Sequence, residues 1–156
     1  MKFTRTRRGD LGLAAMILLA RSSPALLTAA EIAEGVNGSV PLMHEIMRTL
    51  TRSGLIAGQP SFGGGYRLSK AASEVSALEI VELLEGPVMT DECPLWGRRC
   101  RWESVCPRLV SDIDPSLVCP LHSLWQPIRE ATARALEGLS LMDLAARDEL
   151  AEALAE

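Results

Sequence analysis

The sequence contains few aromatic residues. Only 4% of its 156 residues are Phe, Trp or Tyr, whereas 47% are hydrophobic. A folded core must therefore be filled mainly by Leu, Ala, Val, Ile and Met, and this mixture favours helices. With 23% charged residues, the composition is that of a folded soluble chain, either one domain or a small domain with an added helix.

Long hydrophobic runs are also missing. The segment "LGLAAMILLA" is ten residues long, which is too short to span a bilayer. The basic start "MKFTRTRRGD" before it resembles the beginning of a signal peptide, but Asp10 separates the two segments. We therefore expect a cytoplasmic protein without membrane contact, in which disulfides are not the default state of cysteine.

Motifs typical of enzymes are absent too. The glycine-rich stretch "GGGY" lacks the lysine and the following helix of a phosphate-binding loop. No paired carboxylates and no Cys–His pair stand at a spacing that suits catalysis. We therefore expect no enzymatic activity, and an enzyme or electron carrier is the least favoured class.

Charge is divided unevenly along the chain. Residues 1–70 carry nine Lys and Arg against four Asp and Glu, a balance of +5, whereas residues 71–156 carry seven against sixteen, a balance of −9. The net charge of −4 therefore hides a basic N-terminal half. A basic half favours a polyanionic partner. The alternative is an uneven surface charge that has no functional consequence.

The first 86 residues have the element order of a winged helix-turn-helix. Residues 10–22 predict a buried helix, and Thr28 with Glu31 forms a capping box that opens a short second helix. Ser39 is placed to cap a third helix. Two short apolar runs, "LIAG" and "YRLS", then flank a turn rich in Gly and Pro, which predicts a β-hairpin wing. The predicted fold class is mainly α with this small wing and a long C-terminal dimerisation helix.

The third helix divides into an apolar face and a polar face. Four residues share the apolar face: Met43, Ile46, Met47 and Leu50. The opposite face, the wing and the basic "RTRR" arm suit double-stranded DNA, with the helix in the major groove and the arm on phosphates. The expected DNA contacts are Arg5, Arg7, Thr28, Ser39, Pro41, His44, Arg48, Gly64, Gly65, Tyr66 and Arg67.

The C-terminal part predicts two more helices. One begins at Ser123, with Pro127 in its first turn, and the other is capped by Ser140. An apolar stripe marks the first of them: Leu124, Ile128, Ala131, Ala135 and Leu139. A stripe outside a compact module favours a homodimer on a pseudo-palindromic DNA site, and the alternative is that it packs on its own domain. The expected parts are residues 1–86 for DNA binding, 87–122 for a cysteine loop and 123–156 for the C-terminal helices.

The four cysteines gather between these helical parts. Six residues separate Cys93 from Cys100, five separate Cys100 from Cys106, and twelve separate Cys106 from Cys119. These gaps are longer than those of zinc knuckles. Nearby Arg98, Arg99, Arg101 and Arg108 favour the thiolate form and offset its charge. Soft thiolates suit zinc or an iron–sulfur cluster. Incidental buried cysteines and a metal-free thiol switch are the alternatives.

Taken together, these features resemble the IscR/NsrR family of winged-helix transcription regulators over residues 2–145. "TAAEIAEGV" and "SVPLMHEIMRTLTRSGLI" are similar to its helix-turn-helix, and "FGGGYRLSK" is similar to its wing. "SALEIVELLEG" resembles its linking helix, and Cys93 stands eight residues after Glu85, where the first cluster cysteine is expected. The resemblance implies a bound iron–sulfur cluster that senses redox state, nitric oxide or iron–sulfur status; we favour 4Fe–4S and keep 2Fe–2S as the alternative.

The ligand set implied by this resemblance has several forms. Family members usually carry three cysteines about five residues apart, as in Cys93, Cys100 and Cys106, but "CPLHSLW" at Cys119 matches what normally follows the third cysteine. The segment "PRLVSDIDPSLV" resembles an insertion between the two features.

The family also offers two ligands other than cysteine. A histidine three residues after the last cysteine corresponds to His122, and a carboxylate supplied by the partner subunit corresponds to Asp10, before the first helix. We rank the four cysteines first, three cysteines with Asp10 second, and a set with His122 third. Zinc or a disulfide switch at the same cysteines is the alternative to a cluster.

Overall fold

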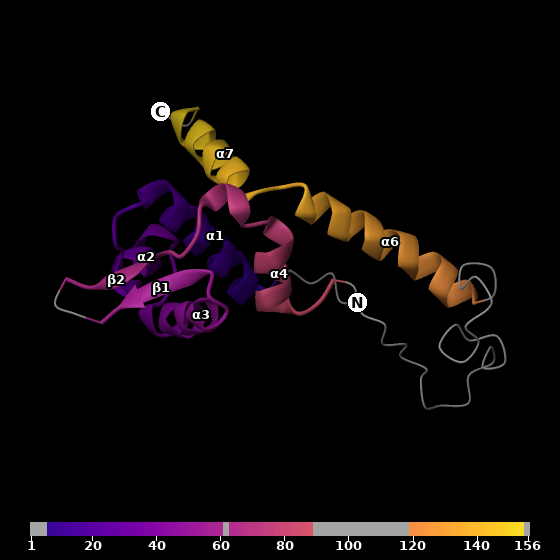
Figure 1. Cartoon of the computed structure of the whole chain (residues 1–156), viewed down its shortest axis with the longest axis horizontal. Helices are drawn as coiled ribbons and strands as arrows, with labels where there is room; N and C mark the ends of the chain where they lie inside the picture. The colour runs from indigo at the N-terminus through magenta and orange to yellow at the C-terminus, as the bar shows by residue number, and fades with distance from the viewer. Residues whose placement is uncertain (1–5, 61–62, 89–118, 155–156) are drawn as a thin grey trace. The chain divides into compact units, whose positions relative to one another are not determined.

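The computed structural model describes residues 6–60, 63–88 and 119–154. The elements in these ranges are, in order, α1 (Arg7–Ser22), α2 (Ala29–Gly35), α3 (Val40–Arg52), β1 (Ile56–Gln59), β2 (Gly65–Leu68), the 3₁₀ turn η1 (Ala72–Glu74), α4 (Ala77–Glu85), α6 (Pro120–Glu137) and α7 (Leu141–Ala153) (Figure 1). β1 and β2 pair antiparallel, with Ile56 opposite Leu68 and Gln59 opposite Gly65. This mainly helical chain with one small hairpin confirms the predicted fold class.

Contacts divide the chain into two compact units. The first holds residues 1–87 and 136–156, and the second holds residues 88–135. Within the described ranges, no helix combines the length and the apolar character needed to cross a membrane.

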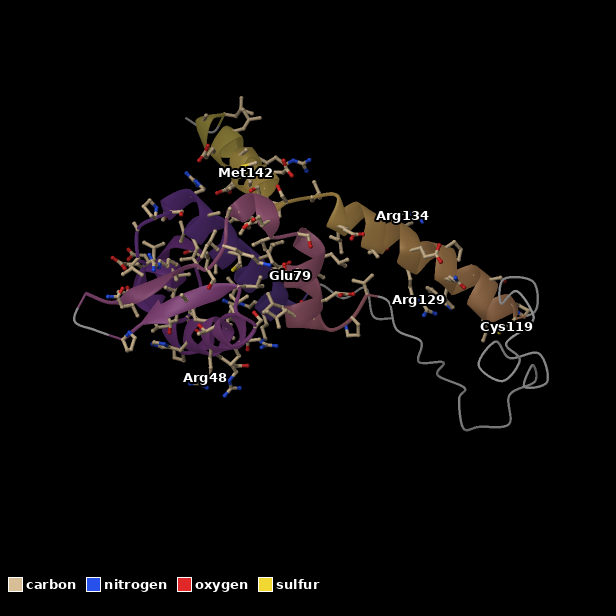
Figure 2. All side chains as sticks on the ribbon, in the orientation of Figure 1. Arg48, Glu79, Cys119, Arg129, Arg134 and Met142 are labelled. Atoms are coloured by element: carbon tan, nitrogen blue, oxygen red, sulfur yellow. The ribbon has the colours of Figure 1, made fainter. Side chains whose placement is uncertain are left out.

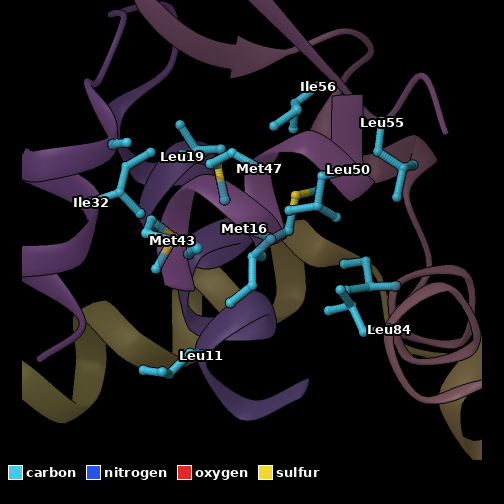
Figure 3. Close-up of a cluster of buried hydrophobic side chains, with 14 of the residues drawn as sticks. Leu11, Met16, Leu19, Ile32, Met43, Met47, Leu50, Leu55, Ile56 and Leu84 are labelled. Atoms are coloured by element: carbon cyan, nitrogen blue, oxygen red, sulfur yellow. The ribbon is translucent and has the colours of Figure 1, made fainter. Parts of the chain in front are cut away.

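The core of the first unit is built around α1. This helix contacts α2, α3, α4, α7 and β2. Its buried face packs against the apolar face of α3, which carries the four predicted core residues Met43, Ile46, Met47 and Leu50 (Figure 3). Every fully buried hydrophobic side chain in the described ranges is aliphatic or Met, as the shortage of aromatic residues predicted.

α1 begins three residues earlier than the sequence indicated. Thr6 is its N-cap, and the Thr6 hydroxyl accepts a hydrogen bond from the backbone N–H of Gly9 at 3.0 Å. Asp10 therefore lies inside the first turn of α1 rather than before it. A carboxylate at this place is stabilised by the partial positive charge of the helix N-terminus.

α6 also begins earlier than predicted, at Pro120 instead of Ser123. Proline suits the first position because no N–H is needed there, and the Cys119 carbonyl accepts the N–H of Ser123 at 2.9 Å. Pro127 consequently lies inside the helix, where one intrahelical hydrogen bond is missing. The prediction that Pro127 occupies the first turn was wrong.

α7 packs back onto the first unit. Leu141 is fully buried in its core, and the predicted cap is present, with the Asp143 N–H donating to the Ser140 hydroxyl. At the end of α1, Arg21 Nη1 donates to Asp148 Oδ2 at 2.7 Å. By contacts, α7 therefore groups with the first unit. The division into a DNA-binding part, a cysteine loop and C-terminal helices stays a prediction.

Candidate nucleic-acid interface

The N-terminus of α2 is fixed by the predicted capping box. The Thr28 hydroxyl accepts the Glu31 N–H at 3.2 Å, while the Glu31 carboxylate accepts the Thr28 N–H and hydroxyl, each at 2.7 Å. These two hydrogen bonds lower the pKa of Glu31 below its ordinary value of 4.5. The bond from the Thr28 backbone has the larger effect, and the bond from the Thr28 hydroxyl has the smaller one. Thr28 is exposed at this helix end.

α3 presents its polar face to solvent as predicted. Pro41, His44 and Arg48 are all exposed, and Figure 2 shows Arg48 pointing away from the core. Ser39 occupies the N-cap position, but its side chain makes no capping hydrogen bond, so the prediction of a side-chain cap was wrong. The exposed hydroxyl of Ser39 remains at the helix end where backbone N–H groups attract anions.

The wing depends on two glycines. Gly63 adopts φ 78°, in the left-handed region that favours glycine. Gly65 has an ordinary φ, but a Cβ there would fall 2.6 Å from the carbonyl oxygen of Leu27. Leu27 and Tyr66 form an isolated antiparallel bridge beside this contact. The wing is thereby joined to the residue that precedes the α2 cap.

These three elements enclose a surface groove of about 430 Å³, which we call the recognition groove. It is lined by Thr28, Ala29, His44, Gly58, Gln59, Pro60, Gly64, Gly65 and Tyr66. Five predicted DNA contacts therefore meet in one groove. Four lining residues were not predicted as DNA contacts: Ala29, Gly58, Gln59 and Pro60. The hairpin register, which pairs Gly58 with Tyr66 and Gln59 with Gly65, could have indicated the strand residues.

The arginines of the predicted DNA-binding part divide into two groups. Arg7, Arg48, Arg52 and Arg67 are exposed. Arg8, which belongs to the "RTRR" arm, instead turns toward α3 and α4, where its Nη2 donates to Thr49 Oγ1 at 3.0 Å. The expectation that the whole arm contacts phosphates is therefore corrected for Arg8. Arg5 lies outside the described residues.

The structure describes only the last of the predicted cluster cysteines. Cys119 is half-buried directly before α6 and is not part of a disulfide within the described residues. Cys93, Cys100 and Cys106 lie outside those residues, as does the side chain of His122, whose backbone lies in α6. Among the described residues, no group of three or more acidic, His or Cys side chains is arranged to hold a metal ion.

The donor set nevertheless fits an iron–sulfur cluster in its chemistry. Thiolates are the usual ligands of such clusters, and four of them complete a 2Fe–2S or a 4Fe–4S cluster. Cys119 presents a sulfur atom on a half-buried side chain, at the end of the segment that carries the other three cysteines. Asp10, in α1, remains the carboxylate candidate.

Comparison with known proteins gives one family and several individual matches. The model of the Rrf2 family, described as an iron-dependent transcriptional regulator, matches residues 5–147. The HTH-type transcriptional regulator IscR of Vibrio atlanticus is 25% identical over 150 residues, covering 94% of this chain and 78% of that protein.

Two solved structures of CymR are also similar. CymR of B. subtilis, a global cysteine regulator, superposes with a TM-score of 0.71 at 25% identity, covering 93% of this chain and 98% of that one. An oxidized form of Staphylococcus aureus CymR superposes with a TM-score of 0.65 at 27% identity, covering 92% and 96% of the two chains.

Proposed function

Because the chain belongs to the Rrf2 family of transcription regulators, we propose that it is a homodimeric repressor or activator whose DNA affinity is set by an iron–sulfur cluster on its cysteines. The observation that carries the proposal is the combination of a winged helix with four cysteines that follow α4. Regulators of this family are generally not enzymes, and the chain is expected to be none.

The DNA-binding step uses the recognition groove and the basic residues around it. The exposed face of α3 enters the major groove, where Arg48 reaches base edges or phosphates and His44 faces the wing. The Ser39 end of α3 and the Thr28 end of α2 bring helix N-termini to the phosphates. The wing, from Gly64 to Arg67, lies against the neighbouring backbone or minor groove, and Arg5 and Arg7 add phosphate contacts.

Dimerisation is assigned to α6. Three of its large apolar side chains are exposed: Leu124 at 54%, Trp125 at 40% and Ile128 at 38%. An exposed apolar face of this kind gains stability when a second copy of the helix covers it. A twofold dimer presents two copies of α3 to a pseudo-palindromic operator.

The sensing step is assigned to Cys93, Cys100, Cys106 and Cys119, with Asp10 and His122 as alternative ligands. When bound, an iron–sulfur cluster supplies a redox-active and nitric-oxide-reactive centre. The chain's own contribution is to connect the cysteines to α4 on one side and to α6 on the other. A change at the cysteines alters DNA affinity only if the two states bind DNA differently.

One observation favours a second candidate, a thiol or disulfide switch without a cluster. The similar structure of Staphylococcus aureus CymR is an oxidized form, and Cys119 of this chain is a cysteine with a partly accessible side chain. A zinc site at the four cysteines belongs to the same alternative, since zinc also takes thiolate ligands.

Both candidates are tested by one binding experiment. A duplex is first selected by the full chain from a random-sequence library, and its affinity is then measured anaerobically before and after metal removal by a chelator. We expect the two affinities to differ at least about fivefold. Equal affinities with metal-free, fully reduced and disulfide-containing protein would contradict both forms of the proposal.

A further inference from the structure

The Arg8 side chain joins the end of α4 to the recognition helix. Its Nη1 donates to the carbonyl oxygen of Leu84 at 3.3 Å, and its Nη2 donates to Thr49 Oγ1 at 3.0 Å. Leu84 is in the last turn of α4, and Thr49 follows Arg48 on α3. Because the guanidinium is planar and rigid, these two bonds fix how far α3 lies from the end of α4.

One donor of Arg8 is left unsatisfied. Nε is buried and has no hydrogen-bond acceptor among the residues that the structure describes. The nearby Glu45 carboxylate, also on α3, has its Oε1 3.6 Å from Nε. This separation exceeds an ordinary N–H···O distance by about 0.6 Å. A movement of α3 by less than about 1 Å is therefore enough to complete the bond.

The end of α4 is tied to the start of α1 at a second point. The Thr6 N–H and hydroxyl donate to Glu85 Oε1 at 3.1 and 2.6 Å. Gly86 then ends the helix with φ 94°, and Cys93 follows seven residues later. Only Gly86 and Pro87 follow the last turn of α4 before the first unit ends, so this turn lies close along the chain to the cysteine segment.

We propose that Arg8 is a positioning residue that transmits a displacement of the α4 end to α3. The inference rests on the proposed sensing function, because a change at the cysteines supplies the displacement. Arg8 is hydrogen-bonded to Thr49 and lies 3.6 Å from the Glu45 carboxylate, and these two residues of α3 lie on either side of Arg48 in the sequence. A sub-ångström shift of α3 exchanges the gap at Glu45 for a hydrogen bond and moves Arg48 relative to the DNA. Two discrete arrangements of this kind are what a switch requires.

The first test measures how strongly DNA affinity depends on the state of the cysteines. The probe is a fluorescein-labelled duplex of about 30 base pairs, long enough for two half-sites, selected from a random library by the wild-type full chain. Arg8→Met keeps the apolar stem and removes every donor, whereas Arg8→Lys retains one ammonium. Arg21→Met is the matched control. Arg21 is also an arginine of α1, but its side chain bonds to Asp148 on α7 instead of to α3 and α4.

We expect at least a roughly fivefold affinity difference between metal-loaded and metal-free wild-type protein, and the same difference in Arg21→Met. In Arg8→Met the two affinities should agree within about twofold, and Arg8→Lys should lie between these results. A full wild-type difference in a folded Arg8→Met variant overturns the proposal. Thermal melts establish that each variant is folded.

The second test needs no cofactor. Gly86→Ala strains the end of α4, because a residue with a Cβ disfavours φ 94°. The affinity of metal-free, reduced full chain for the same duplex is measured in wild type, Gly86→Ala, Arg8→Met and the double variant. We expect Gly86→Ala to change the DNA affinity when Arg8 is present and to leave it unchanged when Arg8 is replaced by Met. The affinity of the double variant should then differ by at least about threefold from the value expected if the two single effects were additive. Additive effects overturn the proposal.

The two tests separate this inference from the proposed function. Equal affinities of loaded and metal-free wild type, together with a non-additive cycle, reject the sensing function and support the coupling by Arg8. A large wild-type difference with an additive cycle rejects the coupling and supports the sensing function.

Discussion

Gly65 of the wing lies directly against Leu27, the residue before the α2 cap. A Cβ at Gly65 would fall 2.6 Å from the Leu27 carbonyl oxygen and 2.7 Å from its carbonyl carbon. The neighbouring Tyr66 N–H donates to that oxygen at 2.8 Å, and the Leu27 N–H donates to the Tyr66 carbonyl at 3.1 Å. The absence of a side chain at Gly65 thus allows the wing and the start of α2 to form one side of the recognition groove.

Gly65→Ala is therefore expected to destabilise the chain by about 1–3 kcal/mol, because backbone atoms rather than a flexible side chain must move. DNA affinity should fall as well, since the recognition groove opens. Gly58→Ala on β1 is the control for stability, because its Cβ would meet only the Tyr66 ring at an ordinary 3.4 Å. Thermal melts of the two variants and duplex binding of Gly65→Ala check these effects, and equal destabilisation by the two substitutions would contradict the close-approach argument.

Arg48 should contribute to DNA binding mainly through charge. Arg48→Ala is expected to weaken duplex binding and, if the side chain contacts a phosphate, to reduce the slope of log K against log salt by about one. The control is Arg147→Ala. Arg147 is an exposed arginine on α7, a helix that packs on α1 and η1 and does not line the recognition groove. The measurement is a salt series of binding isotherms. Equal losses in both variants would indicate non-specific charge rather than a contact by α3.

Two capping carboxylates make stability depend on pH. The pKa of Glu31 is lowered by bonds from the backbone and hydroxyl of Thr28, and that of Asp143 by bonds from the hydroxyl and backbone of Ser140. A lowered folded-state pKa gives stability that is present above the unfolded values of 4.5 and 3.8 and is lost as pH falls through the folded values.

The double variant Glu31→Gln, Asp143→Asn should consequently lose less stability than wild type on acidification from about pH 5 to pH 3. Thr28→Ala, which removes one side of the α2 box, should lower stability at neutral pH by about 1 kcal/mol. Melting temperatures recorded across this pH range test both statements. If the melting temperature of the double variant falls with pH as steeply as that of wild type, the two capping carboxylates make no contribution to the acid sensitivity of the fold.

The exposed apolar face of α6 should hold the dimer together. Leu124→Glu with Ile128→Glu places charges on this face and is expected to shift the chain to monomers, because burying unpaired carboxylates is unfavourable. Leu150→Glu is the control, since Leu150 is 61% exposed on α7. Light scattering after size-exclusion chromatography gives the mass of each variant. A double variant that stays dimeric would place the interface elsewhere.

The elements that carry DNA contacts could be predicted from sequence because their signals are local. The capping box at Thr28, the apolar face around Met43 and the glycine-rich hairpin each depend on residues within a few positions. Both helix starts that were misplaced also carry a local signal, a threonine at the N-cap position of α1 and a proline at the first position of α6, so these boundaries could have been placed more closely from the sequence. Thr6 is held by Glu85, which is 79 residues away in the sequence.

Long-range contacts set the parts that could not be predicted. The inward turn of Arg8 depends on the Leu84 carbonyl and on Thr49, and the docking of α7 depends on Leu141 entering the core beside α1. Neither follows from a pattern along the chain. Of the predicted metal ligands, the structure describes Cys119 and Asp10, so the ligand set stays a prediction.

The central claim, a cluster held by cysteines, is tested most directly by iron and acid-labile sulfide analysis of the anaerobically purified full chain, run beside Cys106→Ala, Cys119→Ala and Asp10→Ala. We expect a coloured protein with iron and sulfide in about equal amounts, as in 2Fe–2S and 4Fe–4S clusters. Both should be lost on replacing either cysteine and retained in Asp10→Ala. A colourless wild-type protein that carries zinc, or no metal at all, would contradict it.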